Sequence, residues 1–139
     1  MDPEINPNYI KPKAFMMRLQ KIMDEYAGGV SANFMTSEAL LKKGLELLEL
    51  LREDAEKLAA KDLHELMRCW EIEHRIWTVE AHLRHIQFRK ETRYPGFYYQ
   101  ADYPGQDDEN WFCFVNSKYD PNTGQWDVFK KDYIKIIPD

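Results

Sequence analysis

The chain has 139 residues, of which 44% are hydrophobic and 31% are charged, so it can form one domain with one hydrophobic core and is not a disordered tail. Its net charge of −5 argues against general nucleic-acid binding, and no apolar run approaches the length of a membrane span. Cys69 and Cys113 are isolated in the sequence, which favours a reducing, cytoplasmic compartment.

The first part of the chain predicts a polar lead-in followed by two helices. Residues 1–11 read as an extended lead-in, and Pro12 suits the first turn of a helix, where its missing N–H costs nothing. Gly28 and Gly29 end that helix, and Thr36 is expected to cap the next one. The apolar face of the first helix consists of Phe15, Leu19, Ile22, Met23 and Tyr26, and that of the second consists of Leu40, Leu41, Leu45, Leu47, Leu48, Leu51, Ala55 and Leu58.

A third, long helix follows a short turn. Asp62 and Glu65 form a capping box at its start. The helical pattern runs toward Thr92, roughly 30 residues or about 45 Å at 1.5 Å per residue. Because so long a helix overhangs a small bundle, its far end must stand in solvent or dock on another surface. Its inward side is expected to carry Leu63, Leu66, Met67, Trp70, Trp77, Leu83 and Ile86.

Helical periodicity stops after Pro95. Residues 111–115 alternate as a strand does, DPNTG at residues 120–124 is a turn signal, and residues 126–129 can form the returning strand. The predicted fold is mainly α: a three-helix bundle with a long third helix, then an irregular aromatic segment and a short β-hairpin. We divide the chain into a lead-in (1–11), a helical bundle (12–93) and an aromatic-rich extension (94–139).

Metal and nucleotide motifs are weak or missing. Glu71 and His74 resemble half of a di-iron carboxylate site, but there is no second such motif, so a solvated helix face is favoured. His82 and His85 supply two metal ligands without a third. The sequence contains no G-x-G-x-x-G, P-loop or G-x-S-x-G motif, and Cys69 on a core helix fits a small buried hydrophobe better than a nucleophile.

Two charged clusters allow more than one interpretation. Arg84, His85, Arg89, Lys90 and Arg93 either complement the dipole at the end of the third helix or form a docking face for an acidic partner. The acidic run at residues 107–109 caps a local turn, pairs with those arginines or is simply solvated.

Aromatic residues reach 14% and gather late in the chain. Tyr94, Phe97, Tyr98, Tyr99 and Tyr103 are irregularly spaced, so they do not define one face of a strand. Three short-looped helices cannot bury them all, and large exposed apolar patches mark interfaces. The residues alone therefore predict a helical bundle with an aromatic extension that packs against something, and they show no catalytic machinery.

A family resemblance extends this interpretation. The segment at residues 64–120, and above all ETRYPGFYY (91–99) and DYPGQDDENW (102–111), resembles the C-terminal region of the alpha subunit in the dissimilatory adenylylsulfate (APS) reductase family. It is more distantly similar to the C-terminal helical domain of succinate dehydrogenase and fumarate reductase flavoproteins.

The wider flavoprotein family has Arg-Gly-x-His-x-Arg-x-Asp-Tyr-Pro at this place, followed by an acidic pair. The chain keeps the Asp-Tyr-Pro and the acidic pair, but it has Pro95, Tyr98 and Gln100 where the wider pattern has Arg, His and Arg. These departures place it on the adenylylsulfate reductase branch.

The resemblance implies a parent enzyme that reduces adenylylsulfate to AMP and sulfite. Its alpha subunit would bind FAD, which forms an adduct with sulfite, and its beta subunit would carry two 4Fe–4S clusters. The FAD and capping domains, with the catalytic residues, would lie upstream. The resemblance places no catalytic, cofactor-binding or metal residue in this chain, so the isolated chain is expected to be neither an enzyme nor a flavoprotein. The residues expected to contact the flavin domain or the beta subunit are Arg89, Arg93, Tyr94, Phe97, Tyr98, Tyr99, Tyr103 and Trp111.

Two other functions stay open at this point. A free-standing helical adaptor would bind a protein partner through the same surface, and a di-iron bundle would carry bound iron. The start at Met1, directly before a linker-like stretch, suits a fragment cut at a domain boundary. An upstream reading frame with a G-x-G-x-x-G fingerprint would favour the enzyme domain over the adaptor.

Overall fold

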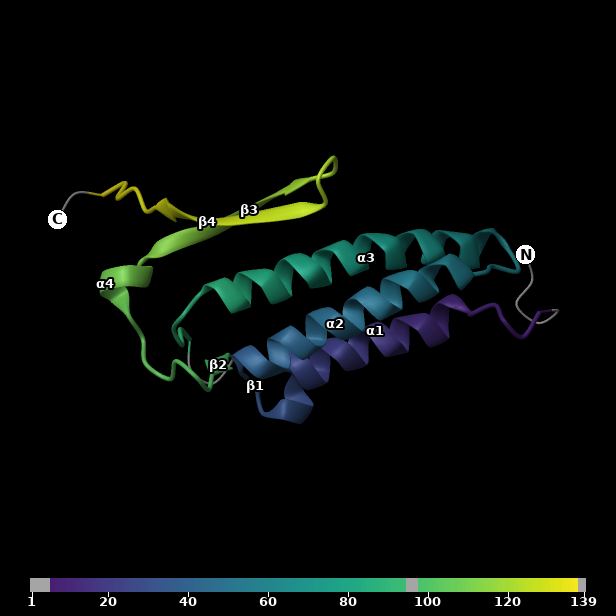
Figure 1. Cartoon of the computed structure of the whole chain (residues 1–139), viewed down its shortest axis with the longest axis horizontal. Helices are drawn as coiled ribbons and strands as arrows, with labels where there is room; N and C mark the ends of the chain where they lie inside the picture. Colours follow the sequence, from purple (N-terminus) through teal and green to yellow (C-terminus); the bar gives the residue numbers. More distant parts are fainter. Residues whose placement is uncertain (1–5, 95–97, 138–139) are drawn as a thin grey trace.

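The computed structural model describes residues 6–94 and 98–137. Three helices lie side by side in it, and a β-hairpin runs along the third of them (Figure 1). The main elements are α1 (Pro12–Tyr26), α2 (Glu38–Asp54), α3 (Leu63–Phe88), β3 (Cys113–Asp120) and β4 (Gln125–Asp132). The shorter ones are η1 (Val30–Ala32), β1 (Met35–Thr36), η2 (Ala55–Lys57), β2 (Tyr99–Gln100) and α4 (Asp108–Trp111). The predicted fold class is confirmed.

The core lies between the three long helices. It consists of Phe15, Leu19, Ile22, Ala27, Leu41, Leu48, Leu51, Ile72, Ile76, Val79 and Leu83. Phe15, Leu19, Ile22, Leu41, Leu48 and Leu51 of the faces predicted for the first two helices belong to this core, and Met23, Leu45, Leu47, Ala55 and Leu58 pack against it partly buried. Leu40, predicted on the same face, is exposed. Gly44 lies on the buried face of α2, and a Cβ there would meet Tyr26 Cβ at 3.0 Å, so its role is to allow a close helix approach.

The ends of α1 and α2 follow ordinary capping chemistry, with one correction to the sequence-based prediction. The α2 cap is Ser37, whose hydroxyl accepts a hydrogen bond from the Leu40 amide at 3.3 Å. Thr36, predicted as the cap, is instead fully buried and donates its hydroxyl to the carbonyl of Tyr26 at 2.7 Å. Its side chain therefore satisfies a carbonyl at the end of α1, where helical partners run out.

The third helix begins as predicted and ends earlier than predicted. The Asp62 side chain accepts a hydrogen bond from the Glu65 amide at 2.8 Å, and the Glu65 carboxylate accepts one from the Lys61 amide at 3.0 Å. The helix spans 26 residues and ends at Phe88, not near Thr92. Arg89 leaves the helix in an extended conformation, and Glu91 and Thr92 bind the segment that follows.

The inward face predicted for α3 is largely the wrong one. Leu63, Leu66, Met67 and Trp70 are exposed, and Trp77 faces the hairpin. The bundle is filled instead by Ile72, Ile76, Val79 and Leu83, of which only Leu83 was expected. The helix carries two apolar stripes on opposite sides, and the larger side chains lie on the outer one.

The hairpin pairs all eight residues of β3 with those of β4, from Cys113 opposite Asp132 to Asp120 opposite Gln125. Its turn is the one predicted: the Gly124 amide donates to the Asp120 carbonyl at 2.8 Å, and Gly124 has a φ of +69°, which favours glycine. The strand begins two residues later than predicted because Trp111 belongs to the single turn α4.

The extension contacts the bundle both near the hairpin turn and at the opposite end. Near the hairpin turn, Trp77 of α3 packs against Tyr119 and Trp126, with ring centroids 4.7 and 6.3 Å apart. At the opposite end, β1 pairs in parallel with β2, so the loop after α1 contacts the segment after α3. No helix in the described parts of the chain is long and apolar enough to cross a membrane.

Candidate functional site

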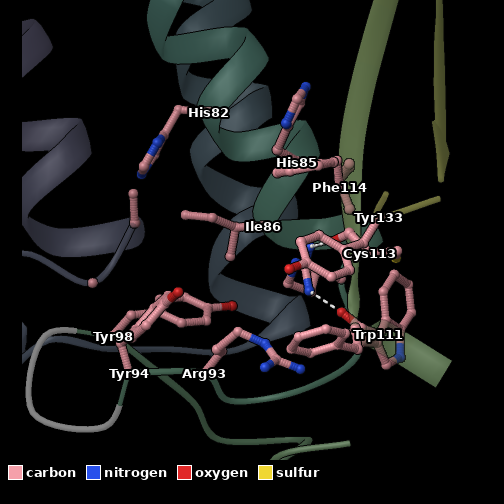
Figure 2. A pocket seen from close by; sticks show the side chains of 15 residues that line it. His82, His85, Ile86, Arg93, Tyr94, Tyr98, Trp111, Cys113, Phe114 and Tyr133 are labelled. Carbon is pink, nitrogen blue, oxygen red and sulfur yellow. Dashed lines mark hydrogen bonds between the residues drawn. The ribbon is translucent and has the colours of Figure 1, made fainter. Parts of the chain in front are cut away.

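A groove of about 670 Å³ lies where α3, the segment after it and the hairpin meet. Figure 2 shows Tyr98, Tyr94 and Arg93 on one side of this groove and Trp111, Phe114 and Tyr133 on the other. The remaining lining residues are Ala27, Gly28, His82, His85, Ile86, Arg89, Phe112, Cys113 and Val115. Most of this surface is aromatic or aliphatic, so the groove is suited to receiving apolar groups.

A buried carboxylate organises one end of the groove. Glu91 is fully buried and accepts hydrogen bonds from Arg89 Nη1 at 2.6 Å, Arg93 Nε at 2.8 Å and the Asp107 amide at 2.9 Å. Burial alone would raise the pKa of Glu91, but Arg93, the Asp107 amide and Arg89 together hold that pKa below its ordinary value. The carboxylate is therefore ionised and joins the segment directly after α3 to Asp107.

Arg89 joins the helix end to the hairpin. Its Nη1 also donates to the Trp111 carbonyl at 2.9 Å, and its Nη2 donates to the Cys113 carbonyl at 2.8 Å. The guanidinium carbon lies 5.6 Å from the Trp111 ring centroid, while Phe88 meets the same ring edge-on at 5.6 Å. Arg89 and Trp111 thus form the support of the groove.

Three members of the basic cluster are paired with carboxylates of the same chain, one of them in the acidic run. Arg93 Nη2 donates to Asp108 at 2.8 Å, Arg84 pairs with Glu80, and Lys90 pairs with Glu38. The acidic run therefore both pairs with an arginine and, through Asp107, caps α4 by accepting from the Asn110 amide. These pairs fix the position of the segment after α3.

The predicted tyrosines divide into two groups. Tyr94 is exposed with a φ of +60°, and Tyr98 is half-buried in the groove wall. The Tyr98 hydroxyl is buried and has no hydrogen-bond partner among the described residues, and burial raises its pKa to about 12. Tyr99 pairs with Met35 in the β1–β2 bridge, and the centroid of the Tyr103 ring lies 5.3 Å from Lys90 Nζ.

Of the predicted contact residues, Arg89, Arg93, Tyr94, Tyr98 and Trp111 meet at the groove, whereas Tyr99 and Tyr103 are not among its lining residues. Phe97 lies outside the described residues.

Sequence reasoning missed two features of the site. The first is the buried polar node of Glu91, Thr92 and Gln100, in which the backbone amide of Gln100 donates to Thr92 Oγ1 at 3.0 Å. The second is the outward aromatic face of the hairpin, where Tyr133 packs against Phe112 and Phe114 at 5.2 and 6.4 Å between ring centroids. A polar Glu-Thr pair directly before an irregular segment was the available signal for the first, and the alternation of residues 112 and 114 for the second.

The candidate metal ligands are separated from one another. Across residues 6–94 and 98–137, no three His, Cys, Asp or Glu side chains are grouped as a metal site would need. His85 shares a hydrogen bond with Ser117 Oγ at 2.8 Å, and its pKa is lowered by burial and by Arg89. Glu71 and His74 are exposed on α3, and Cys69 and Cys113 are free thiols.

The chain matches the family described as fumarate reductase flavoprotein C-term over residues 16–135, which is most of its length. The chain belongs to this family. It is 61% identical over 136 residues to adenylylsulfate reductase subunit alpha of Megalodesulfovibrio gigas, covering 98% of this chain and 20% of that protein. It thus spans about a fifth of the curated relative that it matches.

Solved structures agree with membership of the fumarate reductase flavoprotein C-terminal family. The adenylylsulfate reductase of Archaeoglobus fulgidus is 55% identical with a TM-score of 0.93, covering 99% of this chain and 22% of that one. A structure described as adenosine-5-phosphosulfate reductase with a covalent sulfite adduct matches equally well. A quinol fumarate reductase of E. coli, 18% identical with a TM-score of 0.75 over 97% of this chain and 24% of that one, shares the fold.

Proposed function

We propose that this chain is the C-terminal helical domain of an adenylylsulfate reductase alpha subunit and serves domain and subunit packing. The parent enzyme would take two electrons to convert adenylylsulfate into AMP and sulfite, in the cytoplasm. The observation that supports this best is the 61% identity to such a subunit across 98% of the chain, together with the TM-score of 0.93.

The chemistry of the parent would take place outside this chain. FAD would be bound upstream, and two 4Fe–4S clusters would be held by a beta subunit. The described residues do not fit FAD: the parallel pairing in them is limited to the two-residue β1–β2 pair and the single Ile10–Leu58 bridge, and the sequence has no G-x-G-x-x-G loop. The isolated chain is therefore expected to be inactive, and we derive no catalytic step from its residues.

The aromatic groove is the surface that we assign to packing against the flavin domain or the beta subunit. Tyr94, Tyr98 and the aromatic face of the hairpin would make the contact, while Arg89, Arg93 and Trp111 would hold that surface in shape from behind. The Tyr98 ring supports this role, because it is half-buried in the groove wall and presents apolar surface there.

The identity of the parent is tested first on the native protein from its source cells. The intact subunit mass and the visible spectrum are measured together. A subunit about five times the length of this chain, with flavin and iron–sulfur absorption, is the expected result. A colourless subunit of 139 residues would overturn the proposal and would favour a free-standing adaptor.

The packing role is tested separately by replacing Tyr98 and Tyr99 with serine in the complete enzyme. Assembly, measured by size-exclusion chromatography and native mass spectrometry, should weaken. Tyr98→Phe is the matched control because it keeps the ring and removes only the hydroxyl, and it should assemble nearly as the parent does. Normal assembly and activity of the serine variant would contradict the packing role.

A further inference from the structure

A row of apolar side chains runs along the outer side of α3, interrupted by the exposed His74, and the described residues pack against its later part. Leu63, Trp70 and Trp77 are spaced by seven residues, two helical turns, so they lie on one face, which continues through Ala81 and Phe88. From Trp77 onward the hairpin covers this face: Trp77 contacts Tyr119 and Trp126, and Phe88 contacts Trp111.

The first two turns of the same face are exposed. The relative exposure is 80% for Leu63, 49% for Leu66, 65% for Met67 and 69% for Trp70. We call these four residues the α3 outer strip. Contiguous exposed apolar surface of this kind is uncommon on monomers and marks contact surfaces. The strip continues a face of α3 that is packed against the rest of the chain further along the helix. We therefore interpret the strip as a contact surface for another polypeptide segment.

We propose that the α3 outer strip binds the polypeptide that precedes this domain in the parent subunit. This inference rests on the proposed function, in which the chain is the C-terminal fifth of a longer protein. The upstream part of the same subunit would then cover the strip. The strip is a separate surface from the aromatic groove, which lies at the far end of α3.

The path of the chain supports this choice of occupant. Ile10 is hydrogen-bonded to the α2–α3 connection, with its amide donating to the Lys57 carbonyl at 2.8 Å and its carbonyl accepting from the Ala59 amide at 3.1 Å. The lead-in is therefore attached a few residues before Leu63, at the same end of the molecule (Figure 1). A tethered upstream domain would meet the strip at high effective concentration.

The chain length of the relatives supplies the second argument. The matched relatives contain four to five times as much polypeptide as this chain, so a large upstream portion needs contact surface on it. A second copy of the chain, or an iron–sulfur subunit, would not be held at this end by the lead-in. Both are outcomes that the test separates.

The test is photo-cross-linking in the complete, assembled enzyme. A benzoylphenylalanine is placed at position 70, and the cross-linked peptides are identified by mass spectrometry. A cross-link to a peptide of the same subunit upstream of this domain is expected. A cross-link to a second copy, to the beta subunit, or to no peptide at all would overturn the inference.

A pair of charge substitutions tests the same inference without the cross-linking residue. Met67→Glu should lower the melting temperature of the complete enzyme, because it places a carboxylate in a surface that packing dehydrates. Met17→Glu is the matched control: Met17 is the same residue type on α1 and is 63% exposed against 65% for Met67. Equal effects of the two substitutions would count against the strip as the specific contact.

The two proposals fail in different ways. A native subunit of only 139 residues would overturn the proposed function, and the inference with it. A long flavin-containing subunit whose cross-links lie elsewhere would overturn this inference alone.

Discussion

Replacing Glu91 with glutamine should destabilise the chain by about 3 kcal/mol, although the two side chains have nearly the same shape. The carboxylate accepts from Arg89, from two nitrogens of Arg93 and from the Asp107 amide, and all of it is buried. Breaking a buried charge pair by removing one partner costs about 3–5 kcal/mol. We take the lower end because Arg89 keeps two carbonyl acceptors and Arg93 keeps Asp108.

Urea unfolding at pH 7, followed by far-UV circular dichroism, measures this loss. Glu73→Gln is the control, since Glu73 is exposed on α3 and should change the free energy of unfolding by less than about 0.5 kcal/mol. A Glu91→Gln effect no larger than that of the control would refute the conclusion that this node holds the extension on the bundle.

The pH dependence of the same difference has a definite sign. The folded pKa of Glu91 lies below its ordinary value of 4.5, so its stabilising contribution is complete above that pH. The contribution is lost as the pH falls from about 4.5 through the lower folded pKa. The gap in stability between the parent chain and Glu91→Gln should therefore be constant from pH 7 to 5 and narrow below pH 4.5. A gap that stays constant on acidification would contradict an ionised, paired Glu91.

Two further substitutions test the remaining contacts by the same unfolding assay. Trp77→Ala should lower the free energy of unfolding by about 3 kcal/mol, because the ring packs on Tyr119, Trp126 and the Arg52 guanidinium. Trp70→Ala, on the exposed strip, should change the stability of the isolated chain little. Equal losses for the two substitutions would mean that the two rings have equivalent surroundings. Ser37→Ala should lower stability by about 1 kcal/mol through loss of the α2 cap, and Thr36→Val by about 1–3 kcal/mol because it leaves the Tyr26 carbonyl without its hydroxyl partner. A neutral Thr36→Val would count against a stabilising role for that buried hydrogen bond.

Features that depend on local chemistry could be predicted from the sequence. Pro12 at the start of α1, the Asp62 cap of α3 and the DPNTG turn of the hairpin each need only a few neighbouring residues. The Thr36 cap was wrong by one residue because serine and threonine are both good caps. Tertiary contacts decide which of the two hydroxyls is available to cap the helix, and here the Thr36 hydroxyl is bonded to the Tyr26 carbonyl at the end of α1.

The face of α3 could not be predicted from periodicity, because both faces are apolar. Leucine, methionine and tryptophan lie on the outer stripe and isoleucine, valine and leucine on the inner one, so hydrophobicity does not tell the buried face from the exposed one. The polar node was missed for a related reason. Arg89 and Arg93 lie two residues from Glu91 on either side, but the contact of Glu91 with the Asp107 amide 16 residues away cannot be predicted from its local sequence, and charged residues are mostly exposed.

The aromatic richness of the extension has two physical causes that the structure separates. Trp111, Tyr119 and Trp126 are used inside the chain, where they attach the hairpin to α3 at its base and near its turn. Phe112 and Phe114 are exposed on the opposite face of the strand, because alternate residues of a strand point to opposite sides. A hairpin that needed only to pack on α3 would have a polar outer face. The exposed aromatic cluster at its base, like the second apolar stripe of α3, is accounted for if this domain is one layer of a larger protein.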